Sequence, residues 1–139
     1  MTTNRSLSLA FFLLASIAAN AAAIPGKLSG TITVATALAG KVSTTDTLYI
    51  IARSQPAGPP TAVKRIENPH FPLKYVLGPE DAMMPGAHGF EKGGTLVVVA
   101  RLSKSGNAIA ASGDLEGAFA KNPAHPGAGG VDVKIDHVR

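Results

Sequence analysis

One apolar run constrains the fold of this chain more than any other stretch. Residues 95–100 read Thr-Leu-Val-Val-Val-Ala, with Gly93-Gly94 before them and Arg101 after them. A short aliphatic and β-branched run bounded by glycines is typical of a strand that is covered on both faces. We therefore expect residues 95–101 to form the central strand of a sheet, with the loop 78–94 at one end and the loop 103–107 at the other.

Shorter strand patterns surround this run. Residues 27–35 and 131–138 alternate between apolar and polar side chains, as half-buried strands do, whereas residues 46–53 are apolar at both parities and indicate an interior strand. The mixed polarity of 61–67 favours an edge, and Pro72 places the segment 71–77 at an edge or a bulge. With a weak, alanine-rich strand at 109–115, these segments predict an all-β fold, an antiparallel sandwich of about seven strands.

The N-terminal residues have the pattern of a secretory signal peptide. Arg5 precedes the apolar run 7–19, and small residues at 20–23 suit a signal peptidase. We therefore expect a signal peptide at 1–23, a single domain at 24–139 and a periplasmic or secreted protein. The alternative is that the segment is not cleaved and anchors the protein, and only in that case would the protein contact a membrane. Polar residues interrupt the apolar run, which favours cleavage. Because no cysteine follows the run, a lipid anchor is excluded.

Composition argues against nucleic-acid binding and against catalysis. The formal net charge of +4 is spread among interspersed acidic and basic residues, and aromatic residues make up only 5% of the chain. The chain has no cysteine nucleophile, and none of its serines lies in a Gly-x-Ser-x-Gly motif. Asp114 and Glu116 are two residues apart, and a solvated pair near a turn is favoured over a general acid and base. We expect a protein that is not an enzyme.

Methionine and histidine raise the alternative of a copper site. Met83, Met84 and His88 lie within six positions, and His70 precedes them on another loop. Thioether and imidazole ligands suit Cu(I), and this set is the candidate metal site. The competing interpretation, which is favoured, takes the two methionines as adaptable filler at one end of the sandwich, with no cofactor.

Two arginines and the long loop form the candidate partner site. Arg53 and Arg101 each follow an alanine at the end of an apolar strand, so if these strands are neighbours, the two guanidinium groups line one end of the sandwich. There they are expected to bind a carboxylate or a peptide terminus, although an ordinary rim charge is the simpler interpretation. The loop 78–94 adds an apolar, deformable surface at Met83, Met84 and Pro85, which suits a peptide partner.

Several segments, in order and spacing, resemble one family. The resemblance is to the C-terminal periplasmic domain of the bacterial cytochrome c-type biogenesis factor (CycH-like), which handles apocytochrome c before haem attachment. It extends from about Lys27 to Val138, and its pieces are Leu38–Val42, Asp46–Arg53, Gly58–Pro60 with Ala62–Arg65, Ala82–Gly86, Val97–Ala108 and Gly113–Gly117. The resemblance implies an immunoglobulin-like sandwich and non-catalytic binding of apocytochrome c or of other maturation proteins.

These observations together predict an exported, non-catalytic domain that binds a protein or peptide partner in cytochrome c maturation. Two other functions remain open on the sequence. One is a periplasmic copper-binding protein that uses the methionine and histidine ligands. The other is a small accessory subunit of a membrane or redox complex.

Overall fold

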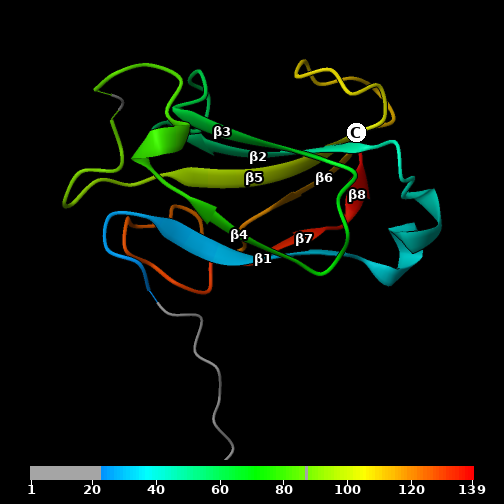
Figure 1. Cartoon of the computed structure of the whole chain (residues 1–139), viewed down its shortest axis with the longest axis horizontal. Coiled ribbons are helices and arrows are strands. Elements are labelled where there is room, and N and C mark those ends of the chain that lie inside the picture. The colour runs from blue at the N-terminus through cyan, green and yellow to red at the C-terminus, as the bar shows by residue number, and fades with distance from the viewer. Residues whose placement is uncertain (1–22, 87) are drawn as a thin grey trace, which may run out of the picture.

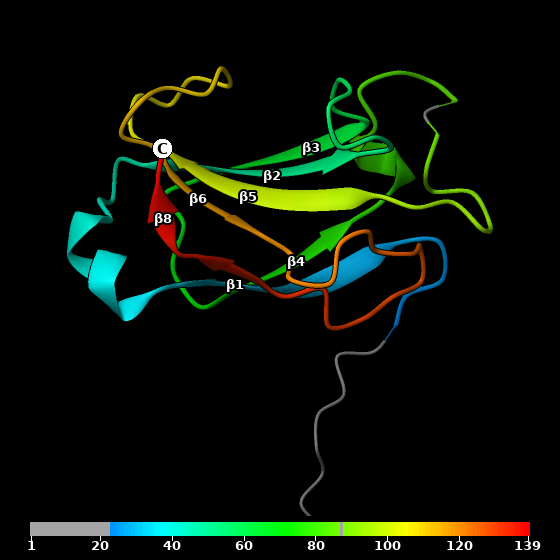
Figure 2. The same ribbon diagram turned by 180° about the vertical axis from the view of Figure 1, so that it is seen from behind.

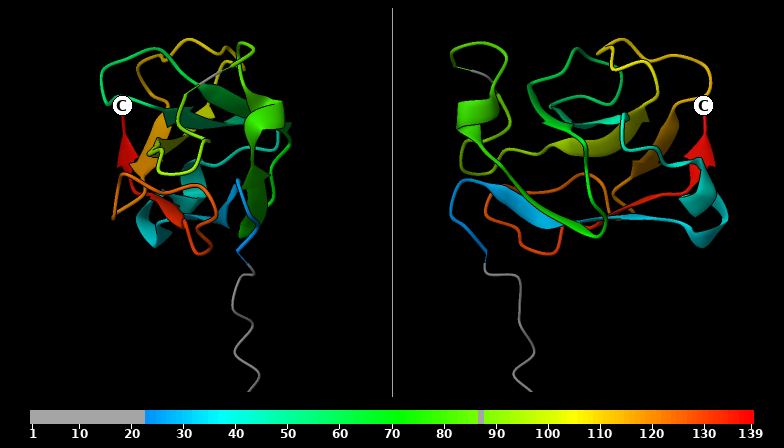
Figure 3. Two further views of the ribbon diagram at one scale, coloured as in Figure 1. Left: turned by 90° about the vertical axis from the view of Figure 1, so that its left-hand side faces the viewer. Right: turned by 45° about the vertical axis from the view of Figure 1, so that its right-hand side comes forward.

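The computed structural model describes residues 23–86 and 88–139 as two β-sheets packed face to face (Figures 1 and 3). One sheet has five strands in the order β3-β2-β5-β6-β8, and the other has three in the order β4-β1-β7. The predicted signal peptide, apart from Ala23, lies outside the described residues. The strands are β1 (Leu28–Val34), β2 (Thr47–Arg53), β3 (Ala62–Glu67), β4 (Leu73–Leu77), β5 (Val97–Ser103), β6 (Leu115–Ala118), β7 (Val133–Ile135) and β8 (His137–Val138), and short 3-10 helices span Thr36–Lys41 (η1) and Pro79–Asp81 (η2).

The core lies between the two sheets and follows the alternation of the sequence. Every second residue of the long strands points inward, and burying these aliphatic side chains is the main favourable term in folding. The alternation predicted for the first and last segments is confirmed at β1 and β7. The fully buried aliphatic side chains include Leu28 and Ile32 of β1, Leu48 and Ile50 of β2, Val98 and Leu102 of β5, and Val133 and Ile135 of β7.

The predicted central strand is β5, the third of the five strands in its sheet. It pairs with β2 on one side and with β6 on the other, both antiparallel. The strand begins two residues later than expected, at Val97, because the amide of Leu96 donates to the carbonyl of Ala124 at 2.9 Å instead of entering the sheet ladder.

Both predicted edge strands lie at edges. β3 ends the five-stranded sheet and β4 ends the three-stranded sheet, with Pro72 just before β4. The sandwich is not antiparallel throughout, because β1 and β7 pair in parallel, with Ile32 opposite Val133. Within the residues that the structure describes, no helix is long and apolar enough to span a membrane.

The prediction of a strand at 109–115 is wrong. Most of this segment belongs to a loop, residues 104–114, and the sheet resumes only at β6. Ile109, at the tip of the loop, is 83% exposed. The physical reason is that the carboxylate of Asp114 accepts hydrogen bonds from the amides of Lys104 and Ala111, which closes the loop before the strand begins.

Candidate partner-binding face

The outer face of the five-stranded sheet, which points away from the core, carries a pocket of about 420 Å³. We call it the outer-face pocket. Figures 1 and 2 show the loop 104–114 at one end of this sheet and the loop 82–94 at the other. The pocket is lined by Tyr49, Ile51, Arg53, Pro60, Val63, Met83, Val99, Arg101, Ala108, Ala110, Glu116 and Arg139.

Strand register builds the floor of the pocket in rows across the sheet. Ile51 of β2 lies opposite Val63 of β3 on one side and Val99 of β5 on the other. Side chains on one face of neighbouring strands contact each other directly, so these three form an apolar row. In the next row, Tyr49 lies between Arg65 and Arg101. An apolar stripe therefore runs beside a polar and aromatic stripe.

The guanidinium group of Arg101 is bound by other groups of the protein. Its side chain is only 3% exposed, and its guanidinium group donates to Asp114 Oδ2 at 3.0 Å. A second guanidinium nitrogen donates to the carbonyl of Ala108, and the group lies over the ring of Tyr49, 5.3 Å from its centre. A planar guanidinium suits a buried pair of this kind because it satisfies several acceptors at once. Arg101 thus ties the loop 104–114 to the sheet.

Asp114 is the partner that makes this arrangement possible. Burial by itself raises the pKa of Asp114, but hydrogen bonds from the amides of Ala111 and Lys104 and the charge of Arg101 outweigh it, and the pKa lies below its ordinary value. The expected solvated pair of Asp114 and Glu116 is therefore wrong at Asp114, which is 1% exposed. The carboxylate oxygens of Asp114 are needed as hydrogen-bond acceptors inside the loop, because buried amides left without an acceptor would destabilise the folded protein.

Arg53 lies in a different environment at the other end of the pocket. It is partly exposed and lies opposite Val97 in the register, whereas Arg101 lies opposite Tyr49. Since β2 and β5 are antiparallel neighbours, the two arginines do not share one end of the sandwich. They line one pocket from positions four residues apart along the strands, which corresponds to about 14 Å. Among the described residues, no carboxylate forms an ion pair with Arg53.

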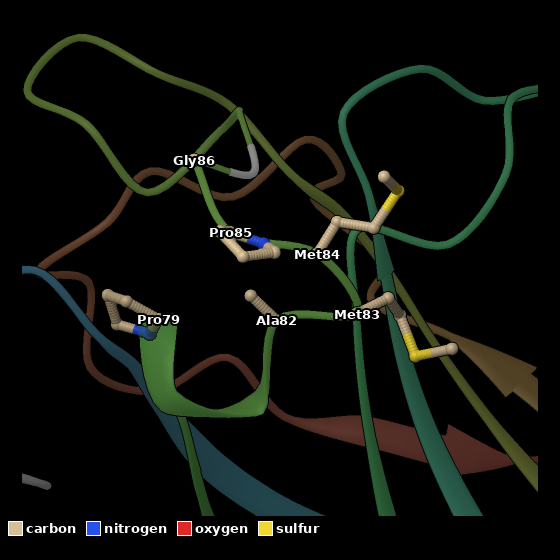
Figure 4. A pocket seen from close by; sticks show the side chains of 6 residues that line it. All are labelled: Pro79, Ala82, Met83, Met84, Pro85 and Gly86. Carbon is tan, nitrogen blue, oxygen red and sulfur yellow. The ribbon is translucent and has the colours of Figure 1, made fainter.

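The methionine loop borders the same pocket. The amide of Met83 donates to the carbonyl of Thr61 at 2.9 Å, and Ala82 bridges to Ala62, so this stretch runs beside the start of β3. Met83 is 61% and Met84 is 72% exposed, so neither fills the core. Figure 4 shows both side chains pointing away from Pro79. A second hollow of about 360 Å³ lies along this loop and is lined by Pro79, Ala82, Met83, Met84, Pro85 and Gly86.

The proposed copper ligands do not all lie in one place. Met83, Met84 and His88 share one loop, and all three are exposed. His70 follows the far end of β3, beyond Glu67, whereas the methionine loop lies beside Ala62 at the start of that strand. Among the described residues, no group of three histidine, cysteine, aspartate or glutamate side chains is arranged to hold a metal ion. The copper alternative stays a prediction about Met83, Met84 and His88.

Sequence reasoning missed the floor of the pocket. Tyr49, Ile51 and Val99 point outward, yet Tyr49 and Ile51 are 4% and 6% exposed. The available signal was that residues 46–53 are apolar at both parities. This pattern indicates a strand covered on both faces, and it also indicates that the outer face of the sheet has an apolar surface of its own.

The comparisons with known proteins identify the family. The family model described as the cytochrome c-type biogenesis protein H Ig-like domain matches residues 28–136, which span nearly all of the two sheets. Neither the comparison with curated proteins nor the comparison with solved structures found a match. The two-sheet fold and the matched range agree with the resemblance seen in the sequence. The chain belongs to the family of cytochrome c-type biogenesis protein H Ig-like domains.

Proposed function

We propose that this domain binds a protein or peptide partner during cytochrome c maturation, in the periplasm, through the outer-face pocket and the adjoining Met83-Met84-Pro85 surface. Its family supports a role in cytochrome c maturation. Apocytochrome c and other maturation proteins are the partners that this family suggests.

The distribution of exposed apolar side chains carries the proposal. Among the described residues, only Met83, Met84, Ile109 and Val138 are large, apolar and exposed. Met83 lines the outer-face pocket, and Ile109 lies between two alanines that line it. Val138 is the exception, because it pairs with the buried Leu115 and so lies on the other face of the sheet. Apolar side chains that gather around one pocket mark an interaction surface, whereas scattered ones need no explanation.

The chemistry of the pocket fits binding better than catalysis. The residues that line it include neither serine nor histidine, and the one side-chain carboxylate among them, on Glu116, accepts a hydrogen bond from Arg139 at 2.9 Å. Arginine, tyrosine and methionine are enriched at protein interfaces, and methionine adapts its shape to different partners. The lining therefore supports recognition of a partner without a chemical step.

The test is capture of haem-free apocytochrome c by the purified protein, measured by biolayer interferometry. We expect Met83→Ser/Met84→Ser to weaken capture at least about tenfold, the effect of losing one or two interface anchors. Lys74→Ser/Lys134→Ser is the matched control, because it shortens two exposed side chains on β4 and β7 of the other sheet. Equal capture by the methionine variant and the wild type, for apocytochrome c and for the maturation proteins alike, would reject this surface as the partner site.

A further inference from the structure

We propose that the outer-face pocket recognises an extended peptide that carries an acidic and an apolar side chain separated by one residue, with Arg53 binding the carboxylate. This inference rests on the proposed function, because it assumes that this face binds a partner. It adds the chemistry that the partner must present and the spacing at which the partner must present it.

The charges of the pocket point to an acidic ligand. Three arginines line it, and two of them are already neutralised: Arg101 by Asp114 at 3.0 Å and Arg139 by Glu116 at 2.9 Å. Arg53 is the remaining one, and no carboxylate among the described residues pairs with it. A guanidinium group binds a carboxylate through two parallel hydrogen bonds, so Arg53 is the position at which an incoming acidic side chain gains most.

The apolar row defines the second contact. Ile51 lies between Val63 and Val99 across three strands, and the side chains of Pro60 and Met83 also line the pocket. The volume of about 420 Å³ falls within the range of small-ligand pockets, about 300–1,000 Å³, so it accommodates a few side chains and not a folded element. An aliphatic side chain that enters it is removed from water against a preformed apolar floor.

Strand geometry fixes the distance between the two contacts. Arg53 and Ile51 are two residues apart on β2 and point to the same face, which separates them by about 7 Å along the strand. In an extended peptide, residues i and i+2 also point to one side at this separation. A peptide that runs along β2 therefore places an aspartate at Arg53 and a leucine at the apolar row when one residue lies between them, in either chain direction.

The same geometry selects against basic peptides. A lysine at the acidic position would approach Arg53 with like charge, and the one side-chain carboxylate that lines the pocket does not offset it, because Glu116 is paired with Arg139. Repulsion of this kind is an effective source of specificity even when the attractive contacts are modest.

The experiment uses nine-residue peptides that are acetylated and amidated, so that a side chain supplies the only carboxylate. Each peptide has serine and threonine at all other positions and contains Leu-Ser-Asp, Asp-Ser-Leu, Leu-Ser-Asn, Leu-Ser-Lys or the adjacent pair Leu-Asp. Binding to the purified, ¹⁵N-labelled protein is followed by NMR titration. We expect one of the two spaced acidic peptides to shift the amides of Ile51, Arg53 and Val97. We expect the asparagine, lysine and adjacent-pair peptides to bind at least about tenfold more weakly, the usual effect of one charge-assisted hydrogen bond.

Two variants and one control assign the effect to Arg53. Arg53→Gln is expected to lower affinity for the preferred peptide about tenfold and to abolish the preference for aspartate over asparagine. Arg53→Lys retains the positive charge but not the bidentate geometry, so it keeps a reduced preference for aspartate. Lys74→Gln, which removes one exposed positive charge from β4 in the other sheet, is expected to change nothing.

Equal binding of the aspartate and asparagine peptides, an unchanged affinity in Arg53→Gln, shifts that map to another face, or no binding by any peptide would each overturn the proposal. These failures are distinguishable from failure of the proposed function. Capture of apocytochrome c that depends on Met83 and Met84, together with peptides that do not bind, would keep the partner site and reject the acidic-apolar ligand.

Discussion

The two ends of the outer-face pocket use the same residue type in different ways. At one end the side chain of Arg101 is 3% exposed, and its guanidinium group contacts Asp114, the carbonyl of Ala108 and the ring of Tyr49. At the other end Arg53 is partly exposed and has no acidic partner among the described residues. The difference shows that exposure and pairing decide the role of an arginine: one stabilises a loop, and the other is free to bind a ligand.

The loops at these two ends differ in the same sense. The loop 104–114 is anchored to the sheet by the contacts of Arg101, by Asp114, and by Tyr49, whose hydroxyl donates to the carbonyl of Gly106 at 2.7 Å. The loop 82–94 joins the sheet through Ala82 and Met83 beside β3 and exposes Met83 and Met84. The loop 104–114 is therefore fixed to the sheet, whereas the loop 82–94 presents flexible methionine side chains. This combination suits a binding surface that holds its position and still adapts to the shape of a partner.

The largest effect should come from breaking the anchored end. Arg101→Met leaves the carboxylate of Asp114 buried without its counter-charge, which typically costs about 3–5 kcal/mol of unfolding free energy. Arg53→Met should change the unfolding free energy by less than about 1 kcal/mol, because no charge is stranded. Urea denaturation of the two variants gives the comparison directly, and similar losses in both would contradict the assignment of different roles.

A smaller effect is expected from Asp114→Asn, and it should depend on pH. The pKa of Asp114 is lowered in the folded protein, so its carboxylate stabilises the fold above the ordinary value of 3.8, and this contribution is lost as pH falls through the lower folded value. At neutral pH we expect a loss of about 1–3 kcal/mol, since an amide cannot accept all three hydrogen bonds. The loss is smaller than for Arg101→Met because Arg101 keeps the carbonyl of Ala108 and the ring of Tyr49 as partners when the charge of Asp114 is removed.

The measurement for this variant is the unfolding free energy between pH 2 and pH 7. The gap between wild type and Asp114→Asn should be widest near neutral pH and should narrow below pH 4. A gap that stays constant over this range would show that the charge of Asp114 is not what stabilises the loop.

The adaptable end should tolerate change. Met83→Ser/Met84→Ser is expected to alter the unfolding free energy by less than about 1 kcal/mol, because both side chains are mostly exposed. Emptying a core position instead costs about 2–5 kcal/mol. Thermal and urea unfolding of the variant separate these outcomes. A decrease in unfolding free energy as large as that for a core position would show that the two methionines fill space in the fold and do not serve a partner site.

The smallest effect is expected for copper. Met83, Met84 and His88 are exposed on one loop, and His70 lies too far from this loop along the sheet to act as a fourth ligand. We expect weak Cu(I) binding in competition with a chelator, and no change in it on replacing His70 with alanine, because an unsupported set of soft ligands binds poorly. Tight stoichiometric binding that is lost in Met83→Leu/Met84→Leu would establish the copper alternative.

Much of the fold was predictable because it follows from local patterns. The alternation at β1 and β7, the apolar run at β5 and the proline beside β4 each impose a strand, a burial pattern or an edge position. The segment 109–115 was not predictable in this way, since its alanines fit a weak strand as well as a loop. Its conformation depends on Asp114 and Arg101, which meet only in the folded chain.

For the candidate site, the sequence by itself determined the residue types: two arginines after apolar strands, a methionine pair on a long loop, and an interior strand that is apolar on both faces. Tertiary structure alone decided how they are used. Ala52-Arg53 and Ala100-Arg101 are the same dipeptide, yet antiparallel pairing places Arg53 opposite Val97 and Arg101 opposite Tyr49. Register and direction arise from packing between distant segments, and only that packing brings Asp114 to one guanidinium and leaves the other open.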